Sequence, residues 1–238
     1  MKITLSGYGK MGKEIGQIAK QNNHSITAIL NHTEDWNTYQ KAIADSDVII
    51  DFSEPAVVVA NIKKAFKLNI PVVVGTTGWD DQKEEIHNLC LANNQAIFVA
   101  SNFSIGVNIF FEVNRFLAKF MDQYPQYNPS IEEIHHTQKL DKPSGTAIEL
   151  AKQMLEKISR KDKYTLDQEI DPTDLKITPK RFEDVPGTHM VTYSSDIDQI
   201  ELKHTAHSRK GFATGAVMAA EWVIGKKGVF GMKDLLGI

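Results

Sequence analysis

The chain has 238 residues, of which 42% are hydrophobic and 24% charged, and its net charge at neutral pH is −3. A chain of this length can bury one large core or two smaller ones, and its charge balance gives no indication of binding to nucleic acid or to a membrane surface. The single cysteine, Cys90, excludes an internal disulfide framework. We expect Cys90 to be a small buried residue of a helix.

No export signal or membrane anchor is expected. Residues 1–5 form an apolar run that leads directly into a glycine turn, which leaves no room for a cleavable segment. No apolar stretch approaches the roughly 20 residues that a membrane-spanning helix needs. We therefore predict a soluble cytoplasmic protein.

Strand and helix signals alternate along the first hundred residues. The predicted strands are 2–7, 25–30, 47–53, 71–78 and 96–104, and the predicted helices are 13–21, 36–45, 57–69 and 82–94. Strands that are apolar throughout and are separated by amphipathic helices favour a parallel sheet covered on both faces. The sequence therefore predicts a doubly wound α/β domain of the Rossmann type.

The pattern changes after Ser104. Helices are predicted at 106–124, 147–158 and 212–226, strands at 131–136, 189–195 and 199–206, a hairpin turn at 196–198 and loops across the polar, proline-containing stretch 159–186. We expect the last helix to pack back on the first domain, which makes that domain discontinuous in sequence. The predicted domains are therefore 1–104 with 211–238, and 105–210.

Residues 7–12 form a G-x-G-x-x-G turn between the first strand and the first helix. Its residues are Gly7, Tyr8, Gly9, Lys10, Met11 and Gly12. Glycines in such a turn allow a sharp bend, close approach of the backbone to a pyrophosphate, and tight packing of helix on sheet. A turn that merely connects strand to helix is the alternative. The position at the first strand–helix junction favours binding of a dinucleotide.

The choice between NADH and NADPH is left open by the sequence. An acidic residue at the end of the second strand would bind the ribose 2′-hydroxyl of NADH, but Asn31 and His32 stand there, with Glu34 and Asp35 just beyond. An arginine placed for a 2′-phosphate is also missing, although Lys10 and His32 could serve in part. We therefore expect modest discrimination between the two nucleotides, below about a hundredfold.

Small polar residues follow three further predicted strands, at 51–53, 75–78 and 100–103. Ligands of doubly wound sheets bind at the carboxyl ends of the strands, so we expect these segments to lie around the same nucleotide as the glycine turn. The alternative is that Ser53 and its neighbours cap a helix and that the other two segments are turns. The repetition at consecutive strand ends favours a ligand, although both interpretations can hold together.

The segment 133–147, EIHHTQKLDKPSGTA, is the densest cluster of polar and titratable side chains. Histidines such as His135 and His136 titrate near neutral pH, and Lys139 adds a cation. Residues 144–146 open a helix, and the unpaired N–H groups at a helix start bind carboxylate or phosphate. A proton donor, a cation and an anion cradle within a few residues predict the reacting part of an enzyme.

Metal binding is not expected. Adjacent histidines on a strand point to opposite faces, so His135 and His136 do not easily share one ion, and no cysteine or carboxylate cluster completes a tetrahedral set. The same geometry lets both histidines serve one substrate only if the strand ends near them. The remaining assignments are a packing role for Trp79, surface positions for His24, His32 and His87, and either a structural or an anion-binding role for His204, His207 and Arg209.

These motifs together resemble the dihydrodipicolinate reductase family, whose members are also called 4-hydroxy-tetrahydrodipicolinate reductases. The resemblance extends over nearly the whole chain, and the double-histidine segment is its most specific part. Besides the glycine turn, the matching segments are Asp51-Phe52-Ser53, Gly75 to Gly78, Ala100 to Ser104, Glu133 to Ala147, Val185 to His189 and His204 to Ala216.

The resemblance implies reduction of a cyclic dicarboxylate by hydride from NADH or NADPH in lysine and diaminopimelate biosynthesis. It also implies a second, α+β domain with a mixed or antiparallel open sheet that binds substrate and assembles a homotetramer. By position, His135 is the general acid/base and Lys139 the proton donor. The implied substrate contacts are His136, Ser144, Gly145 and Thr146. The implied cofactor contacts are the glycine turn, Asn31, Phe52, Gly75, Thr76, Thr77, Ala100, Ser101, Asn102 and Phe103.

Two alternatives come from other classes of protein. One is another two-domain nicotinamide enzyme, such as an amino-acid or diaminopimelate dehydrogenase. The other is a nucleotide-sensing module that keeps the fold without turnover. The density of titratable groups in 133–147 favours an enzyme, because a sensor needs no proton donor.

Overall fold

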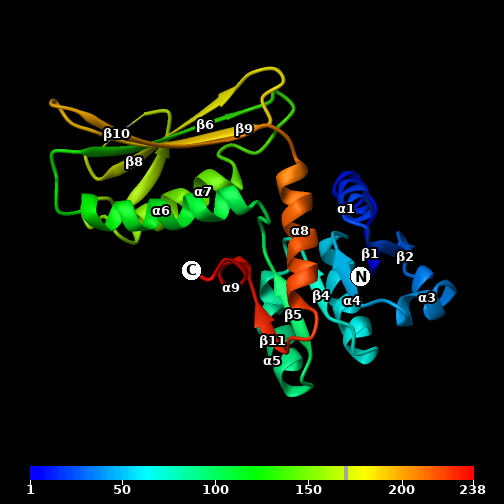
Figure 1. Cartoon of the computed structure of the whole chain (residues 1–238). Coiled ribbons are helices and arrows are strands. Elements are labelled where there is room, and N and C mark those ends of the chain that lie inside the picture. The colour runs from blue at the N-terminus through cyan, green and yellow to red at the C-terminus, as the bar shows by residue number, and fades with distance from the viewer. Residues whose placement is uncertain (169–170) are drawn as a thin grey trace. The chain divides into compact units, whose positions relative to one another are not determined.

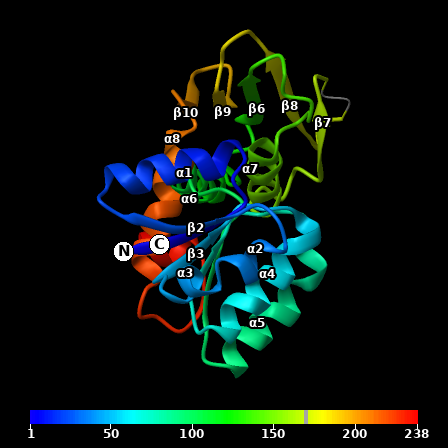
Figure 2. The same ribbon diagram turned by 90° about the vertical axis from the view of Figure 1, so that its right-hand side faces the viewer.

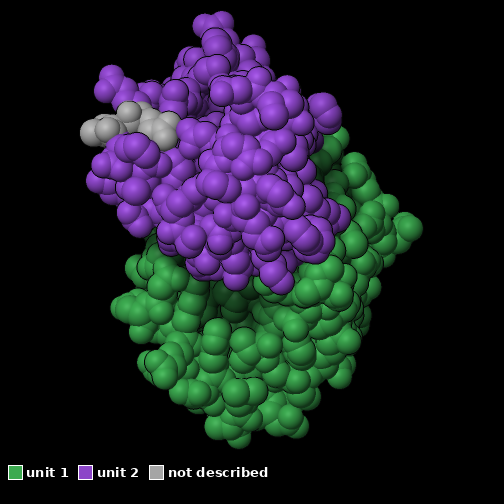
Figure 3. All heavy atoms as spheres, turned by 90° about the vertical axis from the view of Figure 1, so that its left-hand side faces the viewer, with its two compact units in different colours: residues 1–105, 210–238 green, residues 106–209 purple. Residues whose placement is uncertain are grey.

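The computed structural model describes residues 1–168 and 171–238. The chain divides into two compact units, which Figure 3 distinguishes by colour. Unit 1 contains residues 1–105 and 210–238, and unit 2 contains residues 106–209. Of the predicted loop 159–186, residues 169 and 170 lie outside the described residues.

Unit 1 is built on a six-stranded sheet with the order β11-β5-β4-β3-β1-β2 (Figures 1 and 2). Every pairing in it is parallel, so the carboxyl ends of neighbouring strands lie at one edge. Its strands are β1 (Lys2–Ser6), β2 (Ser25–Leu30), β3 (Val48–Asp51), β4 (Val72–Val74), β5 (Ala96–Val99) and β11 (Gly228–Phe230). Its helices are α1 (Lys10–Gln21), α2 (Asp35–Thr38), α3 (Gln40–Ala44), α4 (Pro55–Lys67), the short 3-10 helix η1 (Asp80–Gln82), α5 (Lys83–Ala92), α8 (Lys210–Val223) and α9 (Met232–Leu236).

Helices cover both faces of this sheet. One apolar cluster joins β1, β3 and β5 to α1 and α8, and a second joins the sheet to α4 and α5. Small residues let α8 lie close to the chain beneath it: a side chain at Gly215 would place its Cβ 1.8 Å from the Phe103 carbonyl oxygen. Helix α8 therefore packs on the sheet of unit 1, and the predicted doubly wound parallel sheet is confirmed.

Unit 2 contains a five-stranded sheet with the order β10-β9-β6-β8-β7. Strand β8 runs parallel to β6 and β7, whereas β9 runs antiparallel to both β6 and β10, so the sheet is mixed. Two helices lie side by side on one face (Figure 1), and their apolar side chains form the core with those of the strands. The elements are α6 (Ile105–Met121), β6 (Asn128–His135), α7 (Gly145–Leu155), β7 (Lys163–Leu166), β8 (Asp174–Arg181), β9 (Gly187–Ser194) and β10 (Gln199–Ala206).

The prediction of loops across 159–186 is wrong, because this stretch contains β7 and β8. Leu175 and Ile177 are buried while Lys176 and Thr178 are half-buried, which is the alternation of a strand with one covered face. Pro179 misled the sequence interpretation. It lies beyond the last residue of β8 that pairs with β7, where that side of β8 is an edge and a missing N–H is tolerated.

Other expectations about single residues have mixed outcomes. The hairpin at 196–198 is confirmed between β9 and β10, and Cys90 and Trp79 are fully buried, as predicted. The surface assignment is wrong for His24 and His87, which are half-buried. His24 contacts Glu221 at 2.7 Å, and burial lowers the pKa of His87. Within residues 1–168 and 171–238, no helix has the length and apolar character to cross a membrane.

Candidate active site

The glycine turn of unit 1 has the backbone that close contact with a ligand requires. Gly7 has a φ of +84°, and a Cβ there would lie 2.3 Å from the Phe52 carbonyl oxygen. A Cβ at Gly12 would lie 2.1 Å from the Gly7 carbonyl oxygen, whereas one at Gly9 would meet nothing within 4 Å. Gly7 and Gly12 are therefore needed to form the turn. Gly9 leaves the backbone at the start of α1 open to a ligand, together with the exposed Lys10 and half-buried Tyr8 and Met11.

The other predicted strand ends lie along the same sheet edge, because β5, β4, β3, β1 and β2 are consecutive neighbours. The buried Asp51 carboxylate ties them together: it accepts hydrogen bonds from the hydroxyls of Ser53 (2.7 Å) and Thr76 (2.8 Å) and from the Asn61 amide (3.0 Å). Thr76 thus has a structural role, while Thr77 beside it is exposed. Helix α4 begins after the first segment, with Glu54 at its N-cap position, but no side chain there caps it by a hydrogen bond, and the Ser53 hydroxyl bonds to Asp51 instead. The turn and ligand interpretations of the three segments both stay open.

Two phenylalanines pack against each other at this edge, the half-buried Phe52 and the buried Phe103. The Phe52 ring lies over Gly75, where a Cβ would be 2.2 Å from the ring, and it also contacts the buried Phe103. Gly75 is therefore required for this packing. On the neighbouring strand end, Ala100 and Asn102 are half-buried and Ser101 is exposed.

A cavity of about 630 Å³ opens beside the glycine turn. It is lined by residues of the turn, the loop after β2 and the start of α4, among them Tyr8, Asn31, His32 and Phe52. The loop after β2 is held by Asp35, whose carboxylate accepts hydrogen bonds from the N–H groups of Asn31 (2.7 Å) and His32 (2.8 Å). These backbone hydrogen bonds lower the pKa of Asp35. The open turn and the adjoining cavity fit a dinucleotide.

In unit 2, the strand β6 ends between the two histidines. His135 is its last residue and is buried, whereas His136 lies beyond the strand and is half-buried. A Cβ at Gly187 would lie 3.1 Å from His135 Nε2, so that glycine leaves room for the imidazole. The two side chains therefore occupy different environments. The strand ends between them, which is the condition under which both histidines could serve one substrate.

Glu133 is the centre of the buried polar network. Its carboxylate accepts hydrogen bonds from the Ser144 N–H (3.0 Å) and the Arg181 guanidinium (3.1 Å). His135 Nδ1 lies 3.5 Å and His189 Nε2 lies 3.8 Å from the same carboxylate. None of these contacts could be inferred from sequence alone, because Arg181 lies on an unpredicted strand and Glu133 was noted only as part of a motif.

Lys139 and the start of α7 complete the polar segment. The Lys139 ammonium lies 2.8 Å from the Asp141 carboxylate. Burial acts to raise the pKa of Asp141, but the hydrogen bond and the charge of Lys139 outweigh it and the pKa is lowered. Ser144 caps α7 by accepting from the Ala147 N–H, and its hydroxyl also lies 3.1 Å from His189 Nε2. Ser144 is thus engaged internally, whereas Gly145 is exposed and Thr146 half-buried at the helix start.

Burial sets the charge of the network. Desolvation lowers the pKa of His135; the charge of Glu133 opposes this shift, and those of Lys139 and Arg181 add to it. Desolvation likewise lowers the pKa of His189 to about 3, with smaller contributions from the positive charges of His135, His204 and Lys139. His189 is therefore neutral at pH 7, and burial also holds the pKa of His135 below the ordinary histidine value.

Glu133, His135 and His189 each offer a ligand atom, and these atoms lie within 4.8 Å of one another. The sequence pattern did not reveal this grouping, and the prediction that no carboxylate joins the histidines in a possible set of metal ligands is wrong. Both carboxylate oxygens of Glu133 already accept hydrogen bonds, one of them from the cationic Arg181. This surrounding fits a hydrogen-bonded network better than a cation site.

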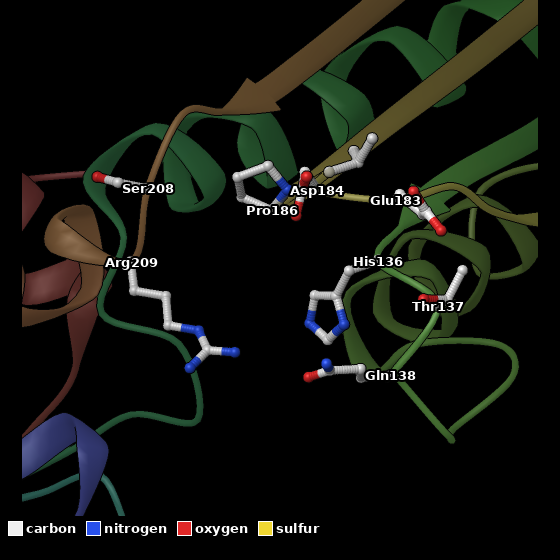
Figure 4. Close-up of a pocket in the computed structure, with 9 residues that line it drawn as sticks. His136, Thr137, Gln138, Glu183, Asp184, Pro186, Ser208 and Arg209 are labelled. Atoms are coloured by element: carbon white, nitrogen blue, oxygen red, sulfur yellow. The ribbon is translucent and has the colours of Figure 1, made fainter.

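A second cavity, of about 450 Å³, lies in unit 2 beside the histidine segment. In Figure 4 the His136 imidazole, the Gln138 amide and the Arg209 guanidinium all point into the space between them. Arg209 therefore belongs to the pocket. His204 does not line the pocket. Its ring centroid lies 6.0 Å from that of Phe110, and burial lowers its pKa, which favours the structural role for that residue.

The fold and the site define an oxidoreductase with a dinucleotide-binding unit and a second unit that carries titratable groups. Residues 1–103 match the family described as dihydrodipicolinate reductase, N-terminus, and residues 106–236 match its C-terminus. The chain belongs to the dihydrodipicolinate reductase family, whose members are nicotinamide-dependent reductases.

Individual relatives agree with this assignment. A 4-hydroxy-tetrahydrodipicolinate reductase from Christiangramia forsetii is 50% identical over 236 residues, which cover 99% of this chain and 98% of the relative. One of the same name from Methanococcoides burtonii is 34% identical and covers 95% and 86%. In fold, the chain is similar to a dipicolinate-bound dihydrodipicolinate reductase from Paenisporosarcina sp., with a TM-score of 0.78, 22% identity and 98% coverage of both chains.

Proposed function

We propose that the protein reduces 4-hydroxy-tetrahydrodipicolinate to tetrahydrodipicolinate in diaminopimelate and lysine biosynthesis, with NADH or NADPH as the hydride donor. The observation that carries this proposal is the 50% identity over the whole chain to a reductase of that name. The amino-acid dehydrogenase and the sensor are not favoured, because both halves of the chain match the reductase family.

The geometry of unit 2 supports a small dicarboxylate as the substrate. Gly145 is exposed and Thr146 half-buried at the start of α7, where unpaired backbone N–H groups suit a carboxylate. His136 and Arg209, which line the pocket, and Lys139 of the same segment are the proposed donors to a second carboxylate. Since the N–H and hydroxyl of Ser144 are used inside the protein, we assign the helix-start contact to Gly145 and Thr146 and give Ser144 a supporting role.

Proton transfer is assigned to Lys139. The bound nicotinamide supplies hydride, and the reduced carbon–nitrogen system then needs one proton. Burial lowers the pKa of His135, so at pH 7 it is neutral and can accept a proton, but it acts as a general acid only after it has taken one up. We therefore propose Lys139 as the immediate donor and His135 as the group that exchanges protons beside it.

The cofactor contacts are proposed for the open turn around Gly9, the loop after β2 and the strand ends at 75–77 and 100–103. His32 is the basic side chain that lines the cavity there, and the acidic ones are Glu34 and Glu54. Among the described residues, the lining contains no arginine for a 2′-phosphate, and Asn31 stands where a carboxylate would bind the 2′-hydroxyl, so we propose that both nucleotides are accepted with modest discrimination. A cytoplasmic location and a homotetramer, the latter expected from the family resemblance, also remain proposals.

A coupled assay tests the function. The unstable substrate is generated in place by its synthase, the protein is added, and oxidation of NADH and of NADPH is followed by absorbance. Oxidation that depends on the synthase supports the proposal and gives the cofactor preference directly. Absence of turnover, from protein shown to bind the nucleotide, refutes it. Oxidation of diaminopimelate or another amino acid with NAD⁺ or NADP⁺ would instead restore the dehydrogenase.

A further inference from the structure

Arg181, the last residue of β8, contacts the reacting segment at several points. Its guanidinium donates to the backbone carbonyls of Asp141 (2.7 Å) and Lys139 (3.3 Å) as well as to the Glu133 carboxylate (3.1 Å). It also donates to the carbonyl of its neighbour Lys180 (2.8 Å). The Arg181 side chain is only 9% exposed, although its bond to the Asp141 carbonyl lies at the surface.

The register of the sheet explains why Arg181 reaches this segment. Strands β6 and β8 are parallel, and Arg181 lies opposite His135, the last residue before the segment leaves the sheet. The segment 136–143 then turns back, since the Lys139 N–H donates to the His136 carbonyl. The guanidinium therefore lies beneath the turn that carries Lys139.

Glu133 holds the other end of the same segment. It is completely buried, and its second oxygen accepts the Ser144 N–H at the start of α7. The Glu133–Arg181 ion pair thus ties the middle of the segment, at Lys139 and Asp141, to its end at Ser144. A buried ion pair is stable only when its remaining donors and acceptors are satisfied, and here the backbone of the segment satisfies them.

We propose that Arg181 is a positioning residue that fixes the Lys139 ammonium for proton transfer. The inference deepens the function proposed above and rests on it. Arg181 acts through the backbone of the segment and is not among the residues that line the pocket with His136 and Arg209. A planar guanidinium reaches several acceptors in fixed directions, which a lysine ammonium at the same place does not.

The test compares Arg181→Lys with a matched control, Lys180→Met. Lys180 is the adjacent residue of β8, and its ion pair with Glu132 (2.5 Å) joins the same two strands. For wild type and both variants, we would measure kcat, KM, nicotinamide affinity and hydrogen exchange of the amides in 136–144. Exchange does not depend on the identity of the substrate, so it tests the structural part even if the proposed reaction is wrong.

For Arg181→Lys we expect kcat to fall about 10- to 100-fold and exchange in the segment to rise about tenfold or more. Nicotinamide affinity should be kept, and Lys180→Met should resemble wild type in every measurement. A fall in kcat without faster exchange would overturn the proposal, as would a rise in KM at constant kcat, which indicates direct substrate contact. Faster exchange with unchanged kcat would overturn it too. Wild type that exchanges slowly but shows no turnover would refute the reaction instead.

Discussion

His189 makes the stability of unit 2 depend on pH in a predictable direction. Its folded-state pKa is lowered to about 3, chiefly by desolvation, whereas an unfolded histidine has a pKa of about 6.5. A proton therefore binds His189 more tightly in the unfolded chain than in the folded one. The free energy of unfolding consequently decreases as the pH falls from the unfolded pKa toward the folded one. At pH 5 the unfolded chain is stabilised by about 2 kcal/mol relative to pH 8 by this residue alone.

The perturbation that isolates this effect is His189→Gln, which removes the titration and retains an amide that can bond to the Ser144 hydroxyl. The pKa values of His87, His135 and His204 are also lowered, and because these groups titrate in both proteins the comparison removes most of their contribution. Between pH 8 and pH 5, the free energy of unfolding should therefore fall by about 2 kcal/mol more in wild type than in the variant.

Denaturant titrations followed by far-ultraviolet circular dichroism measure this difference. Trp36, Trp79 and Trp222 all belong to unit 1, so tryptophan fluorescence does not report directly on His189. Hydrogen exchange of the β9 amides assigns the change to unit 2. Equal losses of stability in the two proteins would refute the reasoning, because they would show that His189 is not held neutral by burial.

Three further predictions concern the site. Lys139→Ala should lower kcat sharply and His135→Ala should lower it less, and both variants should keep nearly the wild-type affinity for the nicotinamide nucleotide. Steady-state kinetics and nucleotide titration measure these effects. Loss of nucleotide binding in step with kcat would contradict the assigned roles. Asp35→Asn should raise kcat/KM for NADPH relative to NADH by a few-fold, because it removes a negative charge beside the loop where a 2′-phosphate would bind. An unchanged ratio would place the 2′ position elsewhere. A preference of the wild-type protein for one nucleotide above about a hundredfold would contradict the expected modest discrimination. Gly12→Ala should lower both the melting temperature and the nucleotide affinity, whereas Gly9→Ala should lower only the affinity, because a Cβ at Gly12 meets backbone and one at Gly9 meets open space. Calorimetry with nucleotide titration separates the two effects. Equal melting temperatures for both variants would refute this account of the turn.

The Rossmann-type unit was predictable because its signals are local. Continuous apolar runs such as Val72–Val74, flanked by amphipathic helices, specify a parallel sheet, and the parallel arrangement brings the carboxyl ends of the strands to one edge. The short strand Gly228–Phe230 was not predicted, since three residues after a helix give no periodicity to detect. It adds to the sheet by pairing with β5, a contact that depends on the tertiary structure.

The candidate site was predictable in its residue types and not in their environments. The sequence indicates a helix start at Ser144, but it does not show that the Ser144 N–H and hydroxyl are used by Glu133 and the cap. Arg181 was missed because the segment around it is polar on one face and contains Pro179, so its strand has the composition of a loop. Contacts between β6 and β8 join residues nearly fifty positions apart, and no local pattern encodes them.

The alternation of β6 decides which titratable groups are free to react. Ile131, Glu133 and His135 occupy alternate positions and are all buried, so the first histidine of the pair enters the interior with a carboxylate two residues before it. The strand stops there, and His136 is released into the pocket that Arg209 also lines. Burial makes His135 a poor proton donor at rest because its charged form is desolvated. In the function proposed above, the donor therefore comes from the part of the segment outside the sheet, where Lys139 Nζ lies 2.8 Å from the exposed Asp141 carboxylate.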